Sequence, residues 1–173
     1  MSRTLLAGPG GRLVLPEPAN LLCSREDGGH LVVLPPRDVW ERSDLDRDEL
    51  MQWGFLVAAA GRAMIETLPH LEGGCINYWE AGNWALNDSA EPVGPKMARR
   101  HRHLHLHVLG RSRTATRETW RWGESPRFPD FAERHTWAAG FEPLRDEECR
   151  KVVEHAVSTL TSRYALPGGA LTI

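Results

Sequence analysis

Histidines recur at every second position in one short stretch of the chain. Residues 101–110 read His-Arg-His-Leu-His-Leu-His-Val-Leu-Gly. This alternation has the period of a β-strand, whose successive side chains point to opposite faces. We therefore predict a strand that turns four imidazoles to one face and its leucines and valine to the core. The four histidines are His101, His103, His105 and His107, half of the eight in the protein, so chance is a poor explanation for the row.

Such a row can bind a metal ion or carry out nucleophilic and acid–base catalysis. Metal binding needs a further ligand beside a His-x-His pair, for which His135 and Glu118 are the candidates. Arginines flank the strand on both sides, at positions 99, 100, 102, 111 and 113. Their positive charge repels a metal cation and attracts phosphate. We therefore expect a phosphate-bearing ligand and no bound metal, with a metal site on the histidine row as the alternative.

Two helices are predicted outside this stretch. Asp46 and Glu49 have the spacing of a capping box, and apolar residues follow them at helical spacing, so a helix is expected over about 45–67. A second helix is expected over about 146–164, capped by Asp146.

Short apolar runs predict the remaining strands. Residues 21–23 and 31–34 flank a turn signal at 27–29, which is typical of a β-hairpin. Two further strands are expected at 75–79 and 83–87. Between the histidine strand and the second helix, residues 111–134 are rich in proline and tryptophan and predict a loop.

The composition is that of one domain of ordinary size. The chain has 173 residues, 41% of them hydrophobic, and a formal net charge of -2. We expect residues 1–173 to form a single domain with frayed ends that needs no disulfide to complete its core. The small net charge argues against binding nucleic acid or membrane by bulk electrostatics. Widely spaced cysteines and the lack of a long apolar run lead us to expect a cytoplasmic protein.

The residues His103-Leu104-His105-Leu106-His107-Val108-Leu109 resemble the His-φ-His-φ-His-φ-φ signature, with φ an apolar residue, of the histidine triad (HIT) superfamily of nucleotide hydrolases and transferases. Residues 29–35 and the acid-rich segment 44–50 are similar to that family's second hairpin strand and following helix. The resemblance covers about residues 20–111 and leaves 112–173 as a C-terminal loop and helix extension. It implies an α+β, HIT-like fold with an antiparallel sheet of about five strands, one main helix and an additional C-terminal helix.

The resemblance also implies a reaction. His105 would be the nucleophile that attacks the α-phosphorus of a nucleotide, forming a nucleotidyl-histidine that passes to water or another acceptor. His103 and His107 would orient it and help the leaving group accept a proton. The implied substrate is a nucleotide or dinucleoside polyphosphate, as for a diadenosine tetraphosphate hydrolase or a nucleoside phosphoramidase. No cofactor is required, a divalent metal on the substrate's phosphates is compatible, and a homodimer is common in the family.

The substrate contacts depart from the family's pattern. Asp38 stands where many members have the histidine of a Pro-x-x-His, and it could accept from ribose hydroxyls or simply be a solvated or helix-capping residue. Asn87 best matches a family asparagine that contacts the nucleotide, with Asn83 as the alternative. Lys96, Arg99 and Arg102 replace neutral donors before the triad and would hold phosphates, unless they form a solvated basic loop.

Trp120 lies among arginines in the 111–134 loop, where it could stack on a base or anchor the loop to the core. The other tryptophans outside this loop, and His30, are assigned to the structural core.

Three other functions compete with hydrolysis or transfer. One is nucleotide binding without turnover, suggested by the missing Pro-x-x-His histidine. The second is the metal site on the histidine row. The third is removal of adenylate from nucleic-acid ends, suggested by the arginine-rich loop, although nucleic acid is not the favoured partner.

Overall fold

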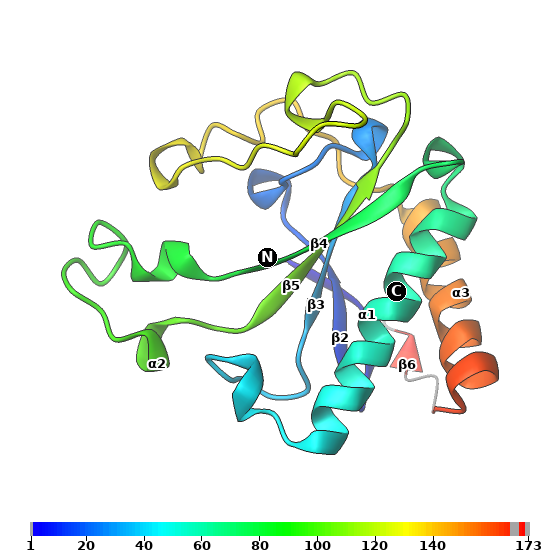
Figure 1. The fold of residues 1–173 in the computed structure, drawn as a ribbon, viewed down its shortest axis with the longest axis horizontal. Coiled ribbons are helices and arrows are strands. Elements are labelled where there is room, and N and C mark those ends of the chain that lie inside the picture. Colours follow the sequence, from blue (N-terminus) through cyan, green and yellow to red (C-terminus); the bar gives the residue numbers. More distant parts are fainter. Residues whose placement is uncertain (1, 167–169, 172–173) are drawn as a thin grey trace.

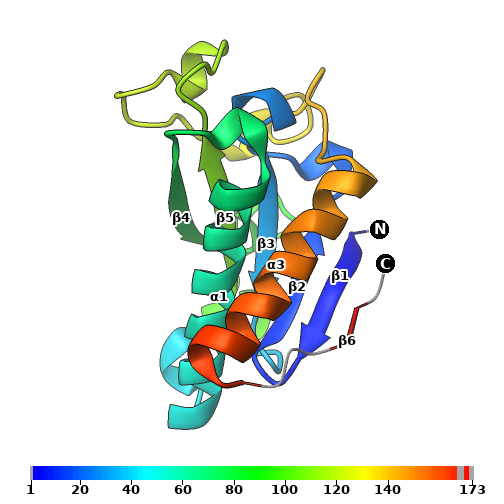
Figure 2. The same cartoon turned by 90° about the vertical axis from the view of Figure 1, so that its right-hand side faces the viewer.

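The computed structural model describes residues 2–166 and 170–171, which form an antiparallel sheet with two long helices on one of its faces (Figures 1 and 2). The strand order is β4-β5-β3-β2-β1-β6. The strands are β1 (Arg3–Gly8), β2 (Gly11–Leu15), β3 (His30–Leu34), β4 (Cys75–Ala81), β5 (His105–Arg111) and β6 (Ala170–Leu171), and the helices are α1 (Arg47–Thr67), α2 (Ala98–His101) and α3 (Asp146–Tyr164). The expected α+β class is confirmed, with the two-residue β6 as a sixth strand beside β1.

Helix α1 begins where the capping box predicts. Asp46 Oδ1 accepts hydrogen bonds from the backbone N–H groups of Asp48 and Glu49, and Glu49 Oε2 accepts one from the N–H of Asp46. The buried face of the helix, which includes Trp53 and Met64, packs in the main core between helices and sheet. Local capping and apolar spacing were therefore sufficient to place this helix.

Helix α3 has the predicted range but a different cap. Arg145 is the N-cap residue, and its backbone N–H donates to Glu148 Oε2. Asp146 lies in the first turn instead, where its carboxylate pairs with Arg3 of β1 at 2.8 Å. The prediction of Asp146 as the cap is therefore wrong by one position. Figure 2 shows α3 beside α1 on the same face of the sheet.

The predicted hairpin of 21–23 with 31–34 does not form. Residues 21–23 are buried but belong to no strand, and the backbone groups of Leu22 bond to side chains instead of to a neighbouring strand. The Leu22 N–H donates to His30 Nδ1, and the Leu22 carbonyl accepts from the indole N–H groups of Trp120 and Trp137. Strand β3 pairs with β2 and β5 instead.

The hairpin that does form lies at the N-terminus. Strands β1 and β2 pair across residues 9–10, which the sequence pattern had assigned to a frayed end. Leu5, Leu6 and Leu13 are almost completely buried in this hairpin. The N-terminal strands are thus part of the core.

Strand β4 confirms the expected strand at 75–79, but the strand predicted at 83–87 is wrong. After Gly82, which has a φ of 135°, the chain enters a 3-10 turn over Asn83–Leu86 and leaves the sheet. Figure 1 shows this segment and α2 extending away from the sheet before the chain returns as β5.

Strand β5 begins at His105, which is later than predicted. His101 is the last residue of α2, so it does not share the strand face with the other histidines. Leu104, Leu106 and Val108 are buried in the main core, as the alternation predicts. The histidine row on this strand face therefore comprises His105 and His107, with His103 just before the strand.

Among the described residues, no helix is long and apolar enough to cross a membrane. All three cysteines are free thiols, and Cys75 is the exposed one.

Gly28 and Gly110 let the end of β5 pass close to the loop before β3. The Gly110 N–H donates to the Gly29 carbonyl at 3.0 Å, and a Cβ on Gly110 would collide with the backbone carbonyl of Gly28. This contact fixes the position of the end of β5, three residues beyond His107.

Gly110→Ala should lower the free energy of unfolding by about 1–3 kcal/mol, because the added methyl group meets backbone that cannot move aside cheaply. The matched control is Gly54→Ala, at an exposed position inside α1 with no atom within 4 Å of the new Cβ. It should raise the free energy of unfolding by about 0.5–1 kcal/mol through helix propensity. Urea denaturation of both variants measures the sign of each change in the free energy of unfolding. Equal changes in the two variants would contradict the close contact of Gly110 with Gly28.

Candidate active site

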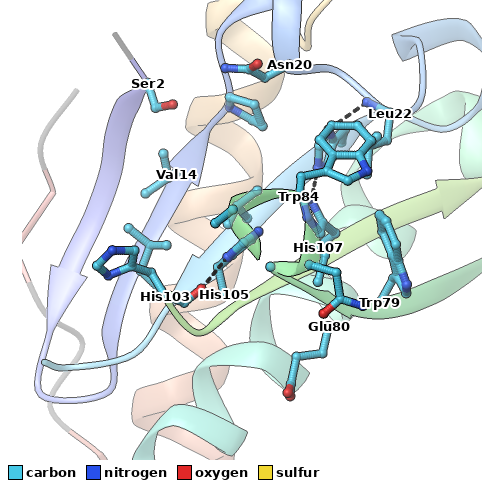
Figure 3. Close-up of a pocket in the computed structure, with 18 of the residues that line it drawn as sticks. Ser2, Val14, Asn20, Leu22, Trp79, Glu80, Trp84, His103, His105 and His107 are labelled. Carbon is cyan, nitrogen blue, oxygen red and sulfur yellow. Dashed lines mark hydrogen bonds between the residues drawn. The ribbon is translucent and has the colours of Figure 1, made fainter. Parts of the chain in front are cut away.

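The histidines line a cavity on the sheet face turned away from the main core. Alternate residues of β5 divide between the two faces: Leu106 and Val108 pack in the core, whereas His105 and His107 line the cavity. The cavity has a volume of about 530 Å³, within the range of small-molecule sites. Figure 3 shows it bordered by β5, β3, β2 and the end of β4.

One hydrogen bond sets the proton position on His105. Its Nδ1 lies 2.7 Å from the backbone carbonyl oxygen of His103, drawn as a dashed line in Figure 3. A carbonyl can only accept, so Nδ1 carries the hydrogen and Nε2 keeps its lone pair in the neutral ring. Burial is the main cause that lowers the pKa of His105 below its usual range. His105 is therefore a neutral imidazole with an unprotonated Nε2 near pH 7.

A second chain of hydrogen bonds sets the proton on His107. The Leu22 N–H donates to His30 Nδ1 at 3.1 Å, so His30 must carry its proton on Nε2. His30 Nε2 lies 2.8 Å from His107 Nδ1, which therefore accepts and leaves its own proton on Nε2. His107 thus presents an N–H donor on the side away from His30.

Burial keeps this chain neutral. Desolvation lowers the pKa of His30 to about 3 and holds the pKa of His107 well below its usual range. His30 is almost completely buried on β3, and His107 contacts its ring at a centroid distance of 5.0 Å. The sequence predicts a structural role for His30. Its hydrogen-bond partner His107 becomes evident only from the pairing of β3 with β5, which sets Val32, two residues after His30, opposite His107.

His103 lies at the cavity but outside the strand. Its Nδ1 lies 2.7 Å from Asp38 Oδ1, and it lines the cavity. The side chains of His103 and Asp38 are 64% and 72% exposed, so solvent screens the pair. Asp38 itself does not line this cavity, and it contacts the site through its hydrogen bond to His103.

Arg102, predicted to hold phosphate, is occupied by protein partners. Its guanidinium donates to the Trp40 carbonyl and to the carboxylates of Glu41 and Glu80, and its side chain is only 12% exposed. Arg42 binds the other oxygen of Glu80 at 2.6 Å. This network holds the end of β4 at the cavity wall through Glu80, and Arg102 itself does not line the cavity.

Three other predicted contacts also lie outside the cavity lining. Asn87 Oδ1 accepts from the Ser89 N–H, and Lys96 Nζ donates to the carbonyls of Asn87 and Gly94, so both residues hold the loop together. Arg99 is exposed on α2. Asn83, the alternative to Asn87, does line the cavity.

Trp120 cannot stack on a base in this structure. It is completely buried, and its indole N–H donates to the Leu22 carbonyl at 2.9 Å, so the alternative reading as a loop anchor describes its place. The aromatic wall of the cavity comes from Trp79, Trp84 and Phe128. Trp79 stacks on Phe128 at a centroid distance of 4.0 Å. The sequence assigns both Trp79 and Trp84 to the core, because neither lies among arginines, and the cavity lining corrects this prediction.

The cavity lining contains no lysine or arginine among the described residues. Its only carboxylate, Glu80, is paired with Arg42 and Arg102. Within residues 2–166 and 170–171, no group of three or more His, Cys, Asp or Glu side chains converges as metal ligands. An anion in the cavity would therefore meet imidazole N–H groups and not guanidinium groups.

The chain resembles a histidine triad (HIT) protein from Sinorhizobium meliloti, with 16% sequence identity, a TM-score of 0.48 and 89% of each chain covered. No protein-family model and no curated protein sequence matches the chain.

His30 makes the stability of the fold depend on pH. Its pKa is about 3 in the folded chain and roughly 6.5 in the unfolded chain, so between these values the unfolded chain binds the extra proton. The free energy of unfolding should therefore rise with pH across this window, and the His30 contribution is complete above about 6.5. One proton contributes a slope of about 1.4 kcal/mol per pH unit. His30→Gln should reduce the slope measured by urea denaturation between about pH 4 and 6.

His101→Gln is the control, because His101 lies on α2 outside this chain of hydrogen bonds. If His30→Gln is too unstable to compare, the nitrogen chemical shifts of His30 in the wild-type protein test the same assignment. A protonated Nδ1 on His30 at neutral pH would contradict it.

Proposed function

We propose that the protein is a nucleotide hydrolase or nucleotidyl transferase of the histidine triad type, with His105 as its nucleophile. The observation that carries this proposal is the hydrogen bond from His105 Nδ1 to the His103 carbonyl. It leaves the Nε2 lone pair of a neutral imidazole at a cavity wall, which is what attack on phosphorus requires.

The proposed reaction has two steps. His105 Nε2 bonds to the α-phosphorus while the bond from that phosphorus to the leaving group breaks, and the leaving group departs with the electron pair. The ring is then cationic, and the His103 carbonyl that accepts from Nδ1 stabilises this charge. Water or another acceptor next attacks the phosphorus and loses its proton, and the N–P bond breaks to restore neutral His105.

The neighbouring histidines take distinct roles in this scheme. His107 Nε2–H, held by His30, is a donor for an oxygen of the α-phosphate. His103, held by Asp38, is the residue that can supply a proton to the leaving group. These roles use only side chains of this chain, and a divalent metal would enter only on the substrate's phosphates.

The aromatic wall supports a nucleoside as the substrate's other part. Trp84 and the stacked Trp79 and Phe128 offer ring faces to a base, while the amide side chains of Asn20 and Asn83 line the same cavity and can read its edge. Figure 3 shows Asn20 and Trp84 on the same side of the histidines.

Nucleotide binding without turnover is the second candidate. It is favoured by the absence of lysine and arginine from the described cavity lining, because cations usually stabilise the charge that develops in phosphoryl transfer. The next experiment separates the two functions.

Mass spectrometry of the protein quenched in mild base during turnover of adenosine phosphoramidate or diadenosine tetraphosphate should find an adenylate adduct on His105. His105→Ala should show no adduct and should lose roughly 10³-fold or more in kcat, because the nucleophile itself is removed. His101→Ala, outside the cavity, is the matched control and should keep both adduct and rate. Tight AMP binding with neither adduct nor turnover would establish the binding protein instead.

The acid limb of the pH–rate profile should lie below pH 6.5. The folded protein lowers the pKa of His105, mainly by burial, so the nucleophile stays neutral at pH values where an exposed histidine is half protonated. Values of kcat/KM from about pH 4 to 8 give the midpoint of this acid limb, and recovery of activity at pH 7 shows that the protein survives the low pH. A midpoint at or above about 6.5 would show that the buried, neutral His105 does not limit the reaction.

A further inference from the structure

A second hollow adjoins the cavity at His103. It has a volume of about 430 Å³ and lies over the loop that follows β3. His103 and Leu34 line both spaces, so they form the boundary between them. The residues that line this second hollow are Arg12, Leu34, Pro35, Pro36, Arg37, Asp38, His103 and Leu104.

Sheet register places Arg12 in line with the nucleophile. Arg12 pairs with Leu34, and the pairing of Val33 with Leu106 sets Leu34 at the level of His105. Two strand spacings therefore separate Arg12 from His105, so their Cα atoms are about 10 Å apart. Val14, two residues along β2, lines the cavity, so Arg12 lies on the same sheet face.

Arg12 is the cation of this hollow that has no partner among the described residues. Arg37 donates to the Glu49 carboxylate and the Asp44 carbonyl, and the Asp38 carboxylate bonds to His103. Arg12 is exposed, and its guanidinium makes no hydrogen bond or ion pair within the part of the chain that the structure describes. An exposed arginine without a partner is common, but this one lies beside a hollow that opens from the catalytic histidines.

We propose that the second hollow holds the leaving group and that Arg12 binds its phosphates, which makes the substrate a nucleoside polyphosphate or dinucleoside polyphosphate. This inference rests on the proposed function, since it assigns the other half of the same substrate. The described lining of the main cavity has no lysine or arginine. A chain of phosphates that extends past His103 into the second hollow can bind the guanidinium of Arg12.

The geometry matches the bond that breaks. With the nucleoside against Trp84 and the α-phosphorus at His105, the leaving oxygen points toward His103 and the phosphates beyond it toward Arg12. When the bond from the α-phosphorus to the bridging oxygen breaks, the departing polyphosphate keeps the electron pair. His103, which lines both spaces, is placed to protonate that oxygen, and Arg12 is placed to neutralise the remaining charge.

The test compares two substrates that share a nucleoside and differ in leaving group. Diadenosine tetraphosphate releases a polyphosphate, whereas adenosine phosphoramidate releases ammonia. Arg12→Gln should lower kcat/KM for diadenosine tetraphosphate roughly 10- to 100-fold, the usual effect of one hydrogen bond to a charged group, and leave adenosine phosphoramidate unchanged. Arg12→Lys should restore part of the loss, because it keeps the charge but not the bidentate geometry.

Arg150→Gln, at an exposed position on α3 across the sheet, is the matched control and should change neither rate. Equal losses on both substrates, or no loss on either, would overturn the role of Arg12 while leaving the proposed function in place. If the wild-type protein turns over neither substrate and forms no His105 adduct, the proposed function fails and this inference fails with it.

Discussion

The chemistry of the site depends on which nitrogen of each histidine carries its proton. Three imidazoles are ordered by partners that leave no choice of tautomer: a backbone carbonyl for His105, a backbone N–H for His30, and His30 itself for His107. Burial then removes the charged forms from the equilibrium near neutral pH. In the proposed reaction, the nucleophile His105 and the donor His107 are thus oriented before any ligand arrives, so no free energy of binding is needed to orient them.

The fold separates this chemistry from the forces that stabilise it. Helices α1 and α3 cover one face of the sheet, and alternate residues of β5 carry the core contacts on that side. The opposite face is free to expose imidazoles and aromatic rings. Positive charge is kept at the margins: Arg102 is held by Glu41 and Glu80, and Arg12 lies in the adjoining hollow. The described lining of the cavity therefore carries no arginine or lysine, and the proposed recognition of charge takes place at its boundary.

Local patterns predicted the features that depend on local interactions. The capping box of α1 and the alternation through Leu106 and Val108 involve neighbours in sequence, so their physics is visible in the chain itself. The N-terminal hairpin and the partner of His30 depend on strand pairing, which alternation does not specify. Arg102 illustrates the limit: its carboxylate partners lie 22 and 61 residues away, and no local pattern distinguishes a phosphate-binding arginine from a structural one.

The peptide groups around Leu22 join two parts of the molecule that differ in their roles. The N–H of Leu22 holds His30, while its carbonyl receives the indoles of Trp120 and Trp137 from the long loop before α3. These hydrogen bonds belong to the two adjacent peptide groups of residue 22, so a displacement of Leu22 moves the support of His30 and the anchor of the loop together. The anchoring of the loop is therefore connected to the position of His30 and, through it, of His107. A substitution of Trp120 or Trp137 would thus reach the histidines of the cavity through the backbone of one residue, with every histidine unchanged.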